Sequence, residues 1–117
     1  MENLEFHNLE FNEGINVTVR RGEGWATRLA PGDVFFFGQE GCGVEVPPAG
    51  VGTCLSAQVY DDLGDIPITL LAYEHDSDCQ SRDGLRDELK RIYGSGGLTG
   101  SFTVIVFTVE PFRMSVE

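Results

Sequence analysis

The chain has 117 residues, 41% of them hydrophobic, and its 19 acidic residues against 8 basic residues give a formal net charge of −11. This composition predicts one globular domain over residues 1–117, and since no apolar run approaches the roughly 18 residues that span a bilayer and no signal peptide is visible, we expect a cytoplasmic protein with no membrane partner. The acidic balance argues against a tight grip on long duplex DNA, because such binding depends on lysines and arginines that neutralise phosphates.

The first 14 residues allow two interpretations. Phe6, Leu9 and Phe11 suit a short amphipathic helix about as well as an irregular strand. We predict the helix, which Gly14 would end.

The following segment alternates apolar and polar side chains, which predicts a half-buried strand over residues 15–20. Its apolar face carries Ile15, Val17 and Val19, and its polar face carries Asn16, Thr18 and Arg20. A loop with the only tryptophan, Trp25, comes next. The residues 31–33, Pro-Gly-Asp, predict a turn, because proline fixes φ and glycine accepts a positive φ. Val34–Phe37 is then a short apolar run, typical of a fully buried strand.

The middle of the chain begins with a glycine- and proline-rich loop, Gln39–Gly52, in which Val44–Val46 suits a short strand. This loop is either a surface excursion or a flap over a site. Alternation predicts the next strand over residues 51–60.

Two helices are predicted after this strand. Asp65 would cap the first helix, with Pro67 in its first turn and its end near Glu74. Ser81 would cap the second helix, which ends at Tyr93 and Gly94. The second helix has an apolar face and an opposite basic face that we interpret as solvated; these faces carry Leu85, Leu89 and Ile92, and Arg82, Arg86 and Lys90.

The last predicted element is a central strand over residues 102–109, an apolar and β-branched run that Pro111 stops. Residues 111–117 are predicted to fray. The order of elements predicts an α+β fold, a small curled β-barrel with two or three helices packed on it.

This order of motifs resembles an ASCH domain, the small barrel related to PUA domains. The matching residues are Gly14, Val17-Thr18-Val19-Arg20, Gly32-Asp33-Val34, Leu70-Leu71 with His75, Leu85 to Ile92-Tyr93, and Val104-Ile105-Val106-Phe107. The resemblance covers nearly all of residues 5–110. It implies a barrel whose first long strand borders a cleft for RNA or a nucleotide-like ligand.

One bacterial branch of that family, the small N4-acetylcytidine amidohydrolases, uses a lysine and a threonine on this strand and a later glutamate. Thr18 matches the threonine, and the glutamate's place falls near Asp78 or Cys79. The lysine is missing, since Ile15 or Asn16 stands in its place. Neither side chain can act as a base or nucleophile, so that branch's chemistry does not carry over as it stands.

The candidate ligand-binding residues are Asn16, Thr18, Arg20 and Trp25, and the candidate catalytic residues are Thr18 and Asp78. Arg20 either binds a phosphate or base edge or forms a salt bridge to a carboxylate such as Asp33. Trp25 either stacks on a base or anchors its loop on the core. Glu74 is an alternative general base to Asp78, and His75 can titrate near neutral pH.

Three hypotheses for function stay open at this stage. The first is a module that binds a nucleoside, a nucleotide or a short single-stranded RNA without firm catalytic activity. The second is a hydrolase acting on a modified nucleobase such as N4-acetylcytidine. The third is an acidic accessory or phage-like protein that binds a basic protein partner.

The sequence predicts no cofactor, and its three cysteines show no usual metal-ligand spacing. Cys42, Cys54 and Cys79 are interpreted as free thiols. A zinc site that combines them with His7 or His75 is the alternative.

Overall fold

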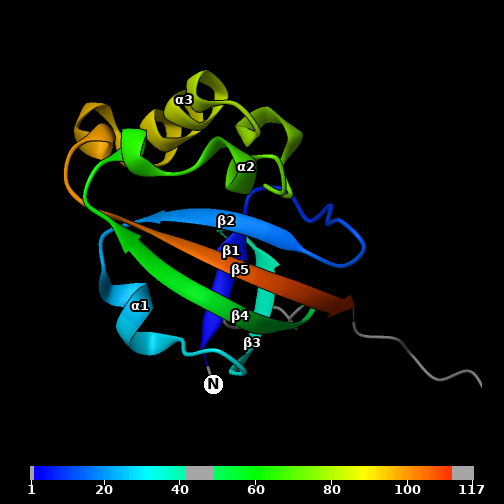
Figure 1. Ribbon diagram of the computed structural model, residues 1–117. Helices are drawn as coiled ribbons and strands as arrows, with labels where there is room; N and C mark the ends of the chain where they lie inside the picture. Colours follow the sequence, from blue (N-terminus) through cyan, green and yellow to red (C-terminus); the bar gives the residue numbers. More distant parts are fainter. Residues whose placement is uncertain (1, 42–48, 112–117) are drawn as a thin grey trace, which may run out of the picture.

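The computed structural model describes residues 2–41 and 49–111, which form an α+β fold built on a curled five-stranded sheet (Figure 1). The strands are β1 (Asn3–Phe6), β2 (Asn16–Arg21), β3 (Val34–Gln39), β4 (Gly50–Tyr60) and β5 (Phe102–Pro111). The α-helices are α1 (Gly24–Arg28), α2 (Ile68–Leu71) and α3 (Arg82–Tyr93), and the short 3-10 helices are η1 (Leu63–Asp65), η2 (Ser77–Cys79) and η3 (Ser95–Leu98). The predicted fold class and the curled sheet are confirmed at this level.

The strands follow the order β1-β3-β4-β5-β2, so β1 and β2 are the two edges of the sheet. β1 pairs with β3 in parallel, and all other pairs are antiparallel. The sheet curls into a half-barrel, and the guanidinium of Arg20 on β2 lies 4.7 Å from the centre of the Phe6 ring on β1. The two edges therefore face each other across an unpaired gap, which we call the seam.

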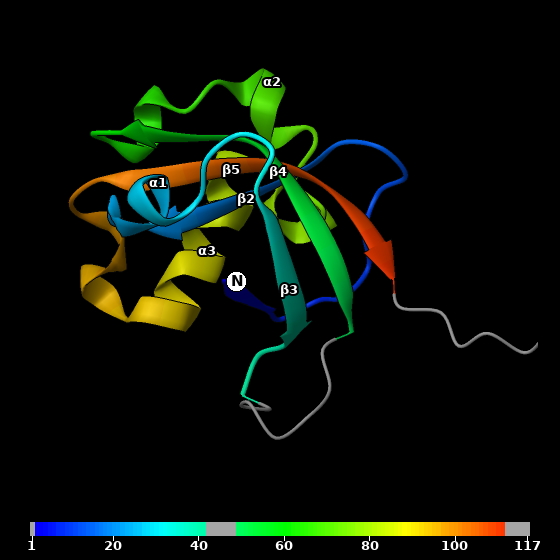
Figure 2. The same ribbon diagram turned by 90° about the horizontal axis from the view of Figure 1, so that it is seen from below.

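Two hydrophobic clusters hold the layers together. The first joins β2 and β5 to α3 and to the segment between β4 and α3; its largest members include Val17, Ile66, Leu71, Leu89 and Phe102. The second fills the curl of the sheet beneath α1; its largest members include Leu4, Phe35, Phe37, Ile105 and Phe107. Figure 1 shows α3 and α1 on different sides of the sheet, and Figure 2 shows α1 from below, where it overlaps β2 and β5.

The predicted strands over residues 15–20, 34–37, 51–60 and 102–109 are confirmed as β2 to β5. The expectation that the first of them is half-buried was wrong, because both faces of β2 are covered from Asn16 to Val19. The central position of the last one is also confirmed, since β5 lies between β4 and β2. The expectation that Val34–Phe37 is fully buried was wrong. Residues along β3 alternate in exposure because only one face of this strand points into the second cluster, and Val34 is 40% exposed.

The predicted N-terminal helix was wrong, because residues 3–6 form a strand. Leu4 and Phe6 point into the second cluster and are 0% and 2% exposed. The parallel pairing with β3, from Asn3 opposite Phe36 onwards, supplies the hydrogen bonds that a helix would otherwise make. A contact between distant segments thus decides the conformation of a short and ambiguous stretch.

The predicted helix from Asp65 to Glu74 was too long. Asp65 belongs to η1, Pro67 precedes α2, and α2 has only one turn. The chain then pairs with β2 instead of continuing as a helix. The Val17 N–H donates to the Tyr73 carbonyl at 2.9 Å, and the His75 N–H donates to the Val17 carbonyl at 3.2 Å.

The helix from Ser81 to Gly94 is confirmed. The Ser81 hydroxyl accepts a hydrogen bond from the Gly84 N–H at 3.1 Å, and Gly94 ends the helix with a φ of 78°. Leu85 and Leu89 are buried as predicted. The interpretation of Arg82 as part of a solvated face was wrong, because its guanidinium donates to the carbonyl oxygens of Leu63 and Ile66.

Several predictions concern residues on or near segments outside the description. The strand suggested at Val44–Val46, the residue Cys42 and the frayed end at 112–117 lie outside the described residues.

The predicted turn at 31–33 is present, with φ of 92° at Gly32 and the Asp33 N–H donating to the Ala30 carbonyl at 3.0 Å.

Candidate functional site

A cavity of about 180 Å³ lies in the seam, bordered by both edge strands, by the segment from Glu74 to Cys79 and by α3. The side chains or backbone that reach it include Glu5 on β1, Thr18, Val19 and Arg20 on β2, Glu74 and His75, and Glu88 and Tyr93 on α3. The cavity exists because β1 and β2 do not pair. Asn16 and Thr18 on β2 are covered by other elements instead of facing open solvent.

Arg20 provides the strongest positive charge in the cavity. Its Nε donates to the Thr18 hydroxyl at 3.3 Å, and its guanidinium lies over the Phe6 ring. Burial lowers the pKa of Arg20, while Tyr93 and Glu74 oppose this shift. Among the described residues no carboxylate forms an ion pair with Arg20, and its terminal nitrogens have no hydrogen-bond partner. The guanidinium stays protonated even when buried, so these donors are available to a ligand.

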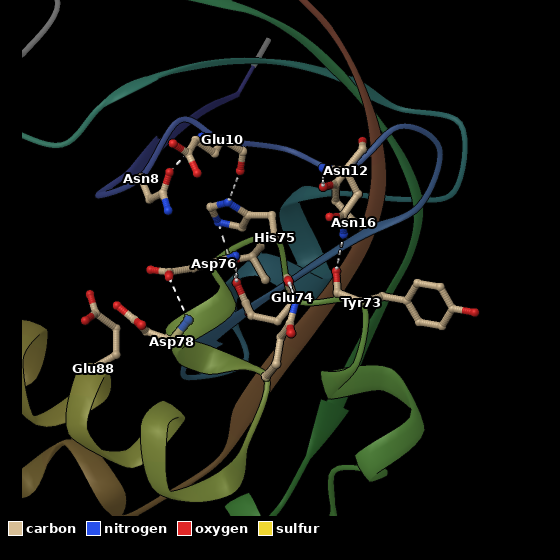
Figure 3. A network of polar contacts seen from close by, with 12 residues as sticks. Asn8, Glu10, Asn12, Asn16, Tyr73, Glu74, His75, Asp76, Asp78 and Glu88 are labelled. Carbon is tan, nitrogen blue, oxygen red and sulfur yellow. Dashed lines mark hydrogen bonds and ion pairs between the residues drawn. The ribbon is translucent and has the colours of Figure 1, made fainter.

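Glu74 and His75 form a buried pair (Figure 3), and both line the cavity together with Arg20. Glu74 is 3% exposed, and its Oε1 lies 3.5 Å from Nε2 of His75. Burial raises the pKa of Glu74 to about 8, although the Asp76 N–H and the Arg20 charge act in the opposite direction. Burial also lowers the pKa of His75. Both shifts favour the uncharged forms, a carboxylic acid next to a neutral imidazole.

The tautomer of His75 follows from its other nitrogen. Nδ1 lies 3.0 Å from the carbonyl oxygen of Glu10, and a carbonyl oxygen only accepts hydrogen bonds. Nδ1 therefore carries the proton in the neutral ring, and the lone pair of Nε2 points toward Glu74. Phe6 and Phe11 contact the imidazole at centroid distances of 4.9 and 4.8 Å, and these rings exclude water from it.

The backbone explains why Glu74 points into the seam. Tyr73 and His75 bond to Val17 through their backbone groups, so this short stretch runs beside β2 like an additional strand. Side chains alternate along an extended segment, and Tyr73, which is 50% exposed, contrasts with the buried Glu74. After His75, Asp76 ends the stretch by accepting a hydrogen bond from the Asp78 N–H at 3.0 Å.

Salt bridges cross the rim of the cavity. Oε1 of Glu40, just after β3, lies 3.1 Å from Nη1 of Arg91 and 3.1 Å from Nδ1 of His7. Partial burial raises the pKa of Glu40, but the hydrogen bonds from Arg91 and His7 outweigh it and lower the pKa overall. Arg91 also contacts Glu88 within α3. These contacts connect the end of β3 to the last turns of α3 over the seam.

Two of the residues selected from the sequence meet in this cavity, namely Thr18 and Arg20. Asn16 is fully buried below them and has a different set of partners. Its Oδ1 accepts from the Asn12 N–H at 2.7 Å, and its Nδ2 donates to the carbonyl oxygens of Asn12 and Gly14. The structure therefore places Asn16 at the base of the loop before β2, away from the residues that line the cavity.

Trp25 and Asp78 lie outside the cavity. Trp25 is on α1 and packs against the second cluster, with the Arg28 guanidinium 3.8 Å from its ring. Asp78 is on η2 and borders a shallow depression together with His7, Asn8 and Glu10. Arg20 and Asp33 are not partners either, because the Asp33 carboxylate accepts from the Ala30 N–H at 2.9 Å.

The position of Glu74 in the cavity was not predicted from the sequence, which offered Glu74 only as an alternative general base to Asp78. The usable signal was a glutamate followed by a histidine, two residues after the mostly apolar run Ile68–Ala72. That signal becomes specific only when the backbone pairing with Val17 is known, because this pairing turns Glu74 toward Arg20. Glu5, Glu40 and Glu88 carried no sequence signal for the site.

Cys54 and Cys79 are free thiols buried in different hydrophobic clusters. Within residues 2–41 and 49–111, no group of three or more histidine, cysteine or acidic side chains is placed to hold a metal ion. Over the same residues, none of the helices combines the length and apolar character needed to cross a bilayer. Comparison of the chain with protein-family models, with curated proteins and with solved structures gives no match.

Proposed function

We propose that the seam cavity binds the base of a nucleoside, a nucleotide or a short single-stranded RNA, as the resemblance to ASCH domains implies. The observation that carries this proposal is the Arg20 guanidinium, which lines the cavity and whose terminal nitrogens have no hydrogen-bond partner among the described residues. These donors are open to the cavity, since no buried side-chain nitrogen or oxygen of the described residues lacks a hydrogen-bond partner. A ligand with acceptor atoms can therefore reach them and accept charge-assisted hydrogen bonds, which are stronger than those between neutral groups. The carbonyl oxygens and the unprotonated ring nitrogens of a nucleobase are such acceptors.

The size and lining of the cavity favour one planar ring over a larger ligand. Its volume of about 180 Å³ is below the range of about 300–1,000 Å³ that is usual for sites of drug-sized ligands. Tyr93 stands at its border and is 40% exposed, so a ring entering the cavity has an aromatic side chain beside it. Base–aromatic stacking contributes about 1–3 kcal/mol.

NMR titration tests this proposal with the four common nucleosides, their 5′-monophosphates and short RNA homopolymers. At least one of them is expected to shift the Arg20 Nε–H resonance, and Arg20→Lys is expected to weaken its binding at least tenfold, because lysine lacks the planar fork of donors. Arg21→Lys is the matched control, since the neighbouring Arg21 is exposed and donates to the Thr99 carbonyl. If no compound perturbs Arg20, or both variants bind equally, the proposal fails.

A second candidate is hydrolysis of a nucleobase amide such as that of N4-acetylcytidine, and the buried Glu74 next to His75 favours it. In this scheme a water molecule attacks the acyl carbon and gives its proton to Glu74. The tetrahedral intermediate then expels the exocyclic amine, which takes that proton, and leaves acetate. A carboxyl whose pKa is raised to about 8 suits both proton transfers near neutral pH.

Release of acetate from N4-acetylcytidine measures this activity directly. Glu74→Gln is expected to abolish it, and Thr18→Ala to reduce it. Asp78→Ala is expected to retain it, because Asp78 lies outside the cavity. Activity that survives Glu74→Gln but not Asp78→Ala would assign the base to the residue selected from the sequence and remove the scheme based on Glu74.

A further inference from the structure

The edge of β2 that faces the seam has an open backbone position at Val19. Hydrogen bonds of successive residues in a strand point to opposite sides. The backbone N–H and carbonyl of Val17 point away from β5, because they form hydrogen bonds to the backbone of Tyr73 and His75. Val19 lies two residues further along the same regular register with β5, so its backbone N–H and carbonyl also point away from β5. The register makes Val19 and Val104 a non-hydrogen-bonded pair, and outside the strand ladders no backbone hydrogen bond between described residues uses the N–H or the carbonyl of Val19.

The open position is only one residue long within the cavity. Val17 is occupied by the segment from Tyr73 to His75, and Arg21 does not line the cavity. Strands usually need at least three residues, so this edge is too short to take a peptide as an additional strand. It offers one donor and one acceptor side by side, in the plane of the sheet.

The opposite wall of the seam is also a strand edge. The carbonyls of Glu2 and Phe6 accept hydrogen bonds from Phe36 and Glu40, so these residues point toward β3 and the region beyond it. The backbone of Glu5, between them, therefore points into the seam, and Glu5 lines the cavity. A flat ligand between the two edges can form, at this one position, the hydrogen bonds that a further strand would form if it closed the barrel.

We propose that the N–H and carbonyl of Val19 read the ligand through a paired contact, one hydrogen bond in each direction. The matching chemical class is a planar edge with a donor next to an acceptor, such as the Watson–Crick edge of a nucleobase. This inference rests on the proposed function and adds which edge of the base is read. Arg20, the next residue, supplies further donors from its side chain.

Three pairs of nucleosides test the edge, each with a parent and an uncharged variant in which methylation removes the donor next to an edge acceptor: uridine and 3-methyluridine, guanosine and 1-methylguanosine (which loses N1–H beside O6), cytidine and N4,N4-dimethylcytidine. In ¹H–¹⁵N spectra a binding parent is expected to shift the Val19 amide, and methylation of its edge is expected to weaken binding at least tenfold. The matched control carries the methyl group on the ribose, as in 2′-O-methyluridine, and is expected to bind like its parent.

The outcomes separate this inference from the proposed function. If parent and edge-methylated nucleosides bind equally and shift Arg20 but not Val19, the paired contact is refuted and base binding stands. If no parent binds, both proposals fail.

A measurement without ligand adds a second test. Scalar coupling through the hydrogen bond is expected from the Val17 amide to the Tyr73 carbonyl and not from the Val19 amide, and a coupling from Val19 to any carbonyl would refute the open position.

Discussion

The carboxyl group of Glu74 has little contact with water, and its Oε1 lies 3.5 Å from Nε2 of the His75 imidazole. Burial penalises the charged form of either group, so the pKa of the acid rises and that of the base falls. Arg20 cannot respond in this way, because its guanidinium keeps its proton at any ordinary pH. The site therefore combines the fixed positive charge of Arg20 with two groups, Glu74 and His75, whose ionisation is opposed by the free energy of burying a charge.

This pair predicts a pH-dependent stability with a definite sign. The pKa of Glu74 is about 8 in the folded chain against 4.5 in its ordinary environment. The folded state then binds more protons than the unfolded state between these values, so the stability due to Glu74 falls as pH rises through this window. His75 has the opposite sign and acts below its ordinary pKa of 6.5. The interval from about pH 6.5 to 8 thus isolates Glu74.

Urea unfolding of the wild type and of Glu74→Gln at several pH values in this interval measures the effect. The stability of the wild type is expected to fall by about 1–2 kcal/mol relative to that of Glu74→Gln, from the linkage of about 1.4 kcal/mol per unit. Glu13→Gln, at an exposed position, is expected to run parallel to the wild type. Parallel curves for Glu74→Gln would contradict a protonated Glu74.

At the scale of elements, α3 depends on a close contact at its first turn. A Cβ added at Gly84 would lie 1.8 Å from the carbonyl oxygen of Asp78 on η2. Glycine inside a helix is normally worse than alanine by about 0.5–1 kcal/mol. At position 84 we expect alanine to be less stable than glycine, because backbone atoms of η2 occupy the space that a methyl group needs.

Gly84→Ala is accordingly expected to destabilise the fold by about 2 kcal/mol or more, in the range of other overpacked sites. Gly24→Ala is the control, since Gly24 begins α1 and has nothing within 4 Å of the added carbon. That variant is expected to be neutral or slightly stabilising. Thermal unfolding compares the two, and a stabilised Gly84→Ala would show that η2 moves aside at little cost.

The elements that were predictable from the sequence are those with long and regular local patterns. Alternation located β2 and β4, and a capped apolar stripe located α3. β1 and α2 were not predictable, because pairing of residues 3–6 with β3 and of residues 73–75 with β2 decides their conformation. The same limit applies to the site. Thr18 and Arg20 follow from one strand's alternation, whereas their meeting with Glu74 depends on a contact across more than 50 residues of sequence.

For the molecule as a whole, the formal charge of −11 is a source of repulsion, since the ion pairs of the described residues involve few of its 19 acidic side chains. The radius of gyration is 14.0 Å. At 0.01 M salt the screening length of about 30 Å exceeds this dimension, and at 0.15 M it falls to about 8 Å. Low salt therefore leaves the carboxylates coupled across the whole molecule. Binding of a basic protein partner, the third hypothesis, stays a prediction.

Raising NaCl from 0.01 to 0.15 M is expected to increase the Tm by about 2–4 °C, because screening this repulsion adds on the order of 0.5 kcal/mol. The double variant Asp61→Asn, Asp87→Asn is expected to show a smaller increase. Both aspartates are exposed, and neither belongs to an ion pair of the described chain. A Tm that falls with salt would mean that local ion pairs such as Arg28–Glu2 outweigh the repulsion.

The position of β5 in the sheet has a consequence for how the chain acquires its structure during translation. β2 pairs with β5 on one side, from Asn16 opposite Phe107 to Arg21 opposite Phe102. Synthesis proceeds from the N-terminus, so β2 leaves the ribosome long before its partner exists. The complete sheet, and with it the seam, can therefore assemble only after residues 102–111 have emerged.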